Sequence, residues 1–175
     1  MARRITAFTT LTPTATADTT NLVDNTYPFL IRGGSTTQVN YIWEVSITGQ
    51  AASSSSPTFM LLSIDSTVSS GTATFGSGGT DTAMDPATAA LAAPVVAANS
   101  FATTKPQRSA TAHLLNCSLN AYGGNFFWRA NRVEECVKLA GSAAPATGLA
   151  GEASLSAFTG GTAGAIGAHM IYESQ

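Results

Sequence analysis

The stretch that decides the fold is QVNYIWEVSIT, residues 38–48. Every second residue along it is apolar, and this apolar set is Val39, Tyr41, Trp43, Val45 and Ile47. Successive side chains of a β-strand point to opposite faces, so a period of two is typical of a strand with one buried face. The sequence therefore predicts a strand over residues 38–48 that turns this apolar set toward a core.

Shorter apolar segments on both sides of this stretch are also predicted to be strands. They are residues 27–32, 59–64, 112–121, 126–129, 134–139, 151–158 and 166–173. Residues 59–64 are apolar on both faces, as is typical of the middle of a sheet. About eight short strands with glycine-rich turns predict an all-β fold, an antiparallel β-sandwich of jelly-roll-like type.

The stretch between residues 66 and 109 lacks this pattern and is predicted to be irregular, with one short helix. Asp85 is a favourable N-cap and Pro86 a favourable first helical residue. The helix is therefore expected over residues 86–93, ending before Pro94.

The first 24 residues are rich in threonine, have no helical period and offer little apolar content for a core. β-Branched threonine and the single Pro13 favour an extended backbone. We therefore expect an extended N-terminal arm over residues 1–24 and a β-sandwich domain over residues 25–175. The arm is expected to lie on a neighbouring subunit through an assembly interface at Arg3, Arg4, Ile5, Phe8 and Leu11.

Charged residues make up only 10% of the chain, against about 25% in an ordinary soluble domain. A surface of Thr, Ser, Gly, Ala and Asn costs little to desolvate, which suits a chain that packs against other subunits. An extracellular β-protein with a Thr/Ser-rich face is the alternative. The net charge of −2 and the lack of a large basic patch argue against nucleic-acid binding. No apolar run approaches the roughly 20 residues that a membrane span needs.

The sequence patterns of known catalytic and cofactor sites do not occur in this chain. There is no GxSxG elbow, and no CxxC or HxxxH spacing for a metal. We therefore expect no enzyme activity, no catalytic, metal-binding or cofactor-binding residues, and no small-molecule ligand. Cys117 and Cys136 have two interpretations, a disulfide between two predicted strands or two free thiols.

Aromatic side chains are densest between Tyr122 and Trp128. In a strand over residues 126–129, Phe126 and Trp128 share one face, and Phe127 and Arg129 share the other. One face is expected to be core, and the other an intersubunit interface or a platform for stacking a sugar.

Four strings carry a resemblance to a known group of proteins: PTFMLLSID, GGTDTAMDPATAALAAP, TTKPQRSATAHLLNCSLNAYGGNFFWRA and GEASLSAFTGGTAGAIGAHMIYE. They resemble a group of small proteins encoded in tailed-bacteriophage genomes, over about Phe59 to Glu173. The resemblance implies a place in the phage particle and supplies no catalytic residues.

Together these observations lead us to expect a virion structural protein, a decoration (cement) protein on the capsid surface that stabilises the head by bridging major capsid subunits. Its expected partners are the major capsid protein and copies of itself, in a homo-oligomer such as a trimer. One alternative is a receptor-binding fibre or spike module, with a glycan site at Trp128 or Tyr122 beside Asn120 or Asn125. The other is a tail-tube or neck protein.

Overall fold

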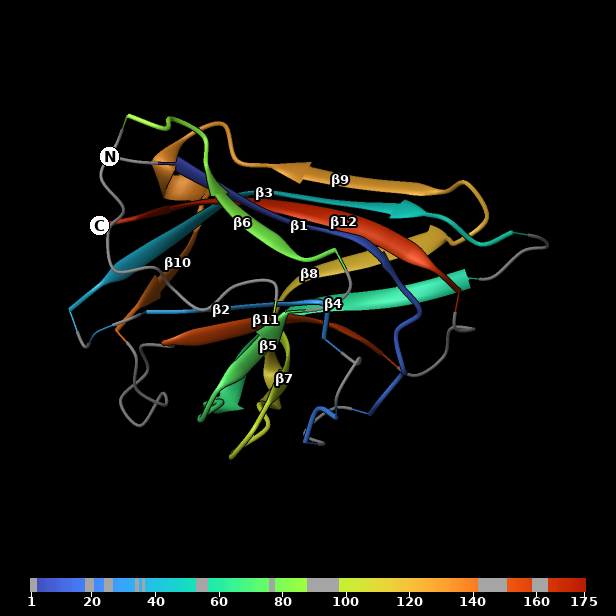
Figure 1. Ribbon diagram of the computed structural model, residues 1–175, viewed down its shortest axis with the longest axis horizontal. Coiled ribbons are helices and arrows are strands. Elements are labelled where there is room, and N and C mark those ends of the chain that lie inside the picture. The colour runs from blue at the N-terminus through green and yellow to red at the C-terminus, as the bar shows by residue number, and fades with distance from the viewer. Residues whose placement is uncertain are drawn as a thin grey trace.

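The structure is a computed structural model, and it describes residues 3–17, 21–23, 27–33, 35, 37–52, 57–75, 78–87, 98–141, 151–158 and 164–175. Over these residues the chain forms strands and one 3₁₀ turn (Figure 1). They are β1 (Arg3–Leu11), β2 (Phe29–Arg32), β3 (Val39–Gly49), β4 (Pro57–Thr67), β5 (Ala73–Phe75), β6 (Thr80–Ala83), β7 (Ala98–Phe101), β8 (Gln107–Asn120), β9 (Asn125–Arg129), η1 (Val133–Glu135), β10 (Val137–Ala140), β11 (Glu152–Ala157) and β12 (Ile166–Ser174).

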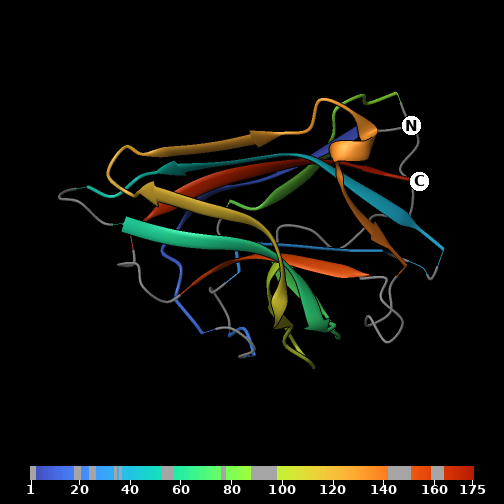
Figure 2. The same ribbon diagram turned by 180° about the vertical axis from the view of Figure 1, so that it is seen from behind.

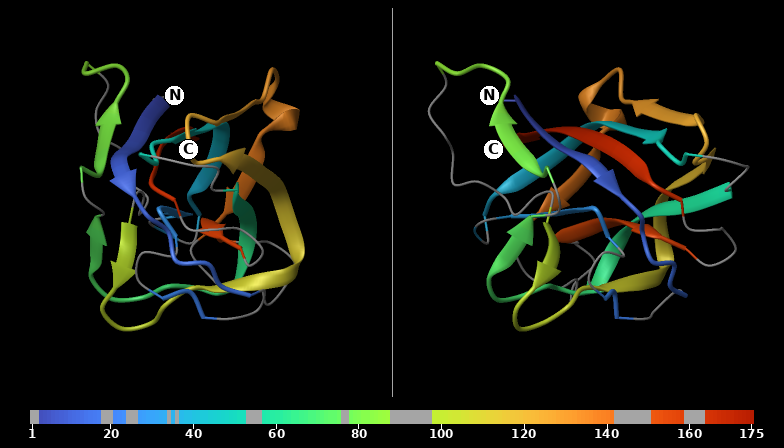
Figure 3. Two further views of the ribbon diagram at one scale, coloured as in Figure 1. Left: turned by 90° about the vertical axis from the view of Figure 1, so that its right-hand side faces the viewer. Right: turned by 45° about the vertical axis from the view of Figure 1, so that its right-hand side comes forward.

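The strands form two main layers, which lie one above the other in Figures 1 and 2. Sheet I has the order β6-β1-β12-β3. Along the other edge of β3, residues 39–42 pair with β10 and residues 44–48 pair with β9. Sheet II has the order β2-β11-β4-β8. A separate pair, β5 and β7, extends from sheet II (Figure 3). All of these pairings are antiparallel, so the predicted all-β antiparallel fold is confirmed.

The order of pairing is nested. β1 pairs with β12, β2 with β11, β3 with β9 and β10, and β4 with β8. The chain thus folds back on itself like one long hairpin that is wrapped into two sheets. The finer jelly-roll assignment stays a prediction, and this nesting is the observation that favours it.

The central prediction for residues 38–48 needs one correction. Ile171 pairs with Glu44 and Tyr172 pairs with Ile42, which leaves Trp43 as an extra residue in β3. A one-residue bulge exchanges the two faces of a strand. Val45 and Ile47 therefore point into the core together with Ile42, whereas Tyr41 and Trp43 lie outside that core.

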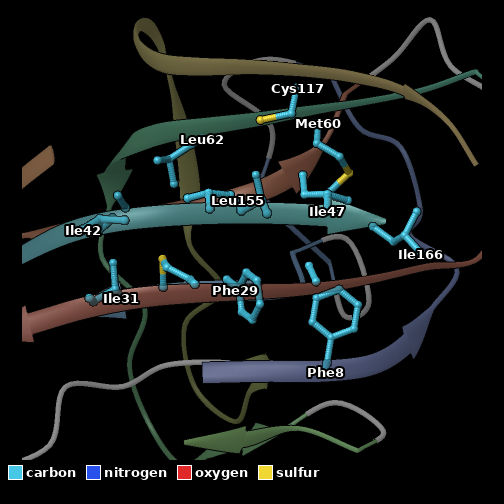
Figure 4. Packing of buried hydrophobic residues seen from close by; sticks show 14 of the residues in the cluster. Phe8, Phe29, Ile31, Ile42, Ile47, Met60, Leu62, Cys117, Leu155 and Ile166 are labelled. Atoms are coloured by element: carbon cyan, nitrogen blue, oxygen red, sulfur yellow. The ribbon is translucent and has the colours of Figure 1, made fainter. Parts of the chain in front are cut away.

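The main core fills the space between the two sheets (Figure 4). Phe8 of β1 and Phe29 of β2 meet edge to face, with ring centroids 5.1 Å apart, and so join the sheets at one side. Residues 59–64 fall within β4, which lies between β11 and β8 as expected of a central strand. Within the core cluster are Met60, Leu62, Leu155 and Met170.

The segment expected to be an arm supplies a strand of the sandwich. β1 lies between β12 and β6, and Phe8 is buried in the core. Further along, Thr16 bridges to Phe158, and the Leu22 amide donates to the Pro106 carbonyl at 2.7 Å. This placement differs from the expected arm because β-branched threonines stabilise a strand as readily as a free extended chain.

A second, smaller core lies on the other face of sheet II. Leu22, Tyr27, Leu30 and Phe101 are buried there, with Tyr27 and Phe101 stacked at 6.2 Å. The helix predicted over residues 86–93 falls mostly outside the described residues. At its expected N-cap the chain forms a turn, in which the Ala87 amide donates to Asp85 Oδ1 at 3.0 Å. Residues 133–135 form the turn η1 instead of the start of a strand.

Candidate functional site

A small group of side chains lies at the start of β1. We call Arg3, Trp43 and Met84 the N-terminal patch. The Arg3 guanidinium lies 4.2 Å from the centroid of the Trp43 ring, and its Nε is 3.7 Å from Glu173. Met84 is 53% exposed, and its amide donates to the Arg3 carbonyl. The positive charge of Arg3 is thus partly neutralised by Glu173 and the Trp43 ring, which lowers the desolvation cost of covering this surface.

Further along the outer face of sheet I, charged side chains are also paired with one another. Glu44 lies 2.8 Å from His169 Nε2 and 3.9 Å from Arg129 Nε. Phe127 is 57% exposed beside them, whereas Phe126 and Trp128 pack against the core. The predicted division of residues 126–129 into two faces is confirmed, and Trp128 is the wrong residue for an exposed sugar platform.

A pocket of about 340 Å³ opens on this same face. It forms where the β1–β12 register shifts between Phe8 and Leu11 and where Gly167 has no side chain. A Cβ at Gly167 would lie 2.5 Å from Gln50 Nε2 and 2.8 Å from the Thr9 carbonyl oxygen. The polar side chains that line the pocket are those of Thr9, Ser46, Thr48, Gln50 and His169.

The most unusual group lies beneath the second core. We call Arg32, Asp65, Arg108 and Glu152 the buried charge cluster. Glu152 accepts hydrogen bonds from the Ser69 amide at 2.9 Å and the Ser69 hydroxyl at 2.6 Å, and its carboxylate lies 3.9 Å from Arg32 Nε. Arg32 also donates to the Ser69 carbonyl. These contacts join β2 and β11 to the segment that leads from β4 to β5.

Arg108 is fully buried and joins three parts of the chain. Its guanidinium donates to Ser156 Oγ at 2.7 Å and to the Ala157 carbonyl at 2.8 Å. It also donates to the Thr16 carbonyl at 3.4 Å and lies 5.5 Å from the ring of Phe158. The residue therefore ties the N-terminal segment to β8 and β11.

Asp65 shares this site with Glu152, and the two carboxyls perturb one another. Ser154 Oγ donates to Asp65 Oδ1 at 2.6 Å, whereas the buried Oδ2 has no hydrogen-bond partner of normal geometry in the described chain. Burial, and then the charge of Glu152, raise the pKa of Asp65 well above its usual range. Burial also raises the pKa of Glu152. Burial and the neighbouring negative charge therefore favour the protonated form of Asp65.

The five residues expected to form an assembly interface are divided between surface and interior. Arg3 lies on the outer face of sheet I, and Ile5 pairs there with Ile171 and Thr82. Arg4 points to the opposite side, where its Nε donates to Asp81 at 3.1 Å. Phe8 belongs to the core, and Leu11 packs against it. The strand period explains this division, since Arg3 and Ile5 alternate with Arg4.

The buried charge cluster was not predicted from the sequence. A signal for it exists, because Asp65 and Glu152 adjoin apolar stretches of a chain with very few charges. Sequence patterns do not show which of these charges meet.

Both cysteines are free, so the disulfide interpretation is wrong for this structure. Cys117 lies in the main core, where burial raises the pKa of its thiol to about 12. Cys136 is partly exposed after η1.

We expect a thiol-reactive maleimide to label Cys136 in the native protein and Cys117 only after unfolding, because the reactive species is an accessible thiolate. Mass spectrometry of labelled peptides at neutral pH measures this difference. Equal labelling of both residues without denaturant would contradict the buried position of Cys117.

Within the described ranges, no three His, Cys, Asp or Glu side chains come together in a group suited to holding a metal ion. The same residues include no helix that is long and apolar enough to cross a membrane.

Comparison of the chain with protein-family models, with curated proteins and with solved structures finds no match. The resemblance to tailed-phage proteins therefore rests on the quoted strings alone.

Proposed function

We propose that this chain is a structural subunit of a phage particle, a capsid decoration protein that docks on major capsid subunits through the N-terminal patch. The observation that carries the proposal is the exposure of Met84 beside Arg3, whose charge is already offset by Glu173 and the Trp43 ring. Aromatic, methionine and arginine side chains are enriched in protein interfaces.

The low charge of the chain and the nested strand order give further support. A chain with 10% charged residues carries few charges with which to repel neighbouring copies. Jelly-roll sandwiches recur in viral capsid and lectin domains, and this support is an analogy at the level of the fold. Many symmetric copies would add weak individual contacts into firm attachment.

The expected mode of docking changes with the position of β1. Between Arg4 and Ala7 both edges of β1 are paired, with β12 and with β6, so this part of the strand is not open to the sheet of a neighbour. The proposed docking therefore uses side-chain contacts of the patch. Arg3 keeps an exposed side chain, at 43%, with which to reach an acidic or carbonyl group of a capsid subunit.

The first test is the copy number of the chain in purified particles, measured by quantitative mass spectrometry against the major capsid protein. The proposal predicts one copy per capsid subunit or a regular fraction of it. A handful of copies per particle, or none, would overturn the decoration role.

The second test replaces the exposed apolar side chain of the patch. The variant Met84→Ser should bind empty capsids about tenfold more weakly, because loss of one methionine side chain buried on docking costs about 1.4 kcal/mol or more. Val23→Ser is the matched control, since Val23 is also 53% exposed. Co-sedimentation with capsids measures binding. If the patch variant and the control co-sediment with capsids equally well, the docking surface lies elsewhere.

A further inference from the structure

An exposed aromatic ring stands at the rim of the sheet I pocket. Phe127 and Ser46 are direct partners across β9 and β3, and Ser46 lines the pocket. Directly opposed residues of an antiparallel pair have Cβ atoms about 5 Å apart, so the ring is within reach of a molecule in the pocket. The pocket is lined by apolar as well as polar side chains, which suits a ligand that has both an apolar face and polar edges.

The pocket also holds polar groups whose hydrogen-bonding capacity is unused. Ser46 and the exposed Gln50 both line it, and neither side chain makes a hydrogen bond within the described residues. A hydroxyl and a carboxamide each donate and accept, which matches the hydroxyl groups of a ligand better than a purely accepting anion.

The charges near the pocket point the same way. His169 at the wall is hydrogen-bonded to Glu44, and Arg129 is also directed to Glu44. No cation among the lining residues is left to hold a phosphate or carboxylate. The volume of about 340 Å³ is at the lower end of the range for small-molecule sites, enough for one sugar ring.

We infer that this pocket binds a neutral saccharide. One face of a pyranose ring packs on Phe127, and its hydroxyl groups bond to Ser46 and the Gln50 amide. The site stands apart from the N-terminal patch and does not depend on the decoration role. It replaces Trp128 and Tyr122 as the sugar-stacking position.

The test uses the full chain and methyl glycosides of glucose, galactose, mannose and N-acetylglucosamine at millimolar concentration. Saturation-transfer NMR detects binding, and titration gives the dissociation constant. At least one glycoside should bind. Phe127→Ser should raise the dissociation constant of that glycoside about tenfold, because one aromatic contact is lost. Ser46→Ala should raise it about fivefold, because one hydrogen bond is lost.

Tyr122→Ser is the matched control, because Tyr122 is also 57% exposed and does not line the pocket. It should change the dissociation constant by less than about twofold. Circular dichroism of each variant checks that the fold is retained. Failure of all four glycosides to bind would overturn the inference, and so would binding that is unchanged in both Phe127→Ser and Ser46→Ala.

Discussion

Arg108→Met is expected to lower the free energy of unfolding by about 3–5 kcal/mol, because three buried acceptors lose their donor at a cost of about 1–3 kcal/mol each. Methionine keeps much of the apolar stem but cannot donate to Ser156 or to the carbonyls of Ala157 and Thr16. These acceptors would remain buried without their donor. Urea denaturation followed by intrinsic fluorescence measures the change.

Arg129→Met is the control for this prediction, because it makes the same exchange at a side chain that is 61% exposed. Its effect should stay within about 0.5 kcal/mol, the usual range for surface substitutions. A loss below about 1 kcal/mol for Arg108→Met would mean that water or a rearranged chain satisfies the acceptors. The buried charge cluster would then not hold the N-terminal segment in place.

Asp65→Asn is expected to stabilise the protein at neutral pH and to flatten its dependence on pH. Because the folded-state pKa of Asp65 is raised, the native protein binds a proton that the unfolded chain releases above about pH 4. The contribution of Asp65 to stability is therefore complete below that pH and is lost as pH rises through the raised pKa. The loss is about 1.4 kcal/mol for each unit of the shift.

Asparagine removes this proton equilibrium and can still accept the hydrogen bond from Ser154. The groups around Asp65 that also carry charge are Glu152, Arg32 and Arg108, and they are unchanged in the variant. Unfolding free energies of wild type and variant between pH 4 and 8 measure the difference curve. Asp85→Asn, at an exposed carboxyl, serves as the control. A variant that is less stable than wild type at neutral pH would show that the Asp65 carboxylate is needed charged.

These two variants examine one physical arrangement. The outer face of sheet II carries charges where a sandwich usually carries solvent-exposed polar residues. Because the second core covers that face, Arg32, Arg108 and Glu152 must satisfy one another and the surrounding backbone. The cluster thereby holds the segments around Thr16 and Ser69 against sheet II.

The sequence by itself determined the all-β class and the positions of most long strands. Local patterns suffice for this, because residues 38–48, 59–64 and 166–173 each show their apolar period or apolar run within one segment. The same period divided Phe127 from Trp128 correctly. It did not reveal β1, whose threonine-rich stretch resembles an extended arm until β12 and β6 pair with it on both sides.

Only the tertiary structure decided which faces and charges meet. The bulge at Trp43 appears when β3 is aligned with β12, more than a hundred residues later in the chain, and it reverses the exposure of Tyr41 and Trp43. The pocket beside Ser46 needs Gly167, and the contact of Arg108 with Thr16 spans 92 positions. Strand periodicity is a local property of the backbone, whereas register, burial of charge and the shape of a pocket depend on which distant segments pack together.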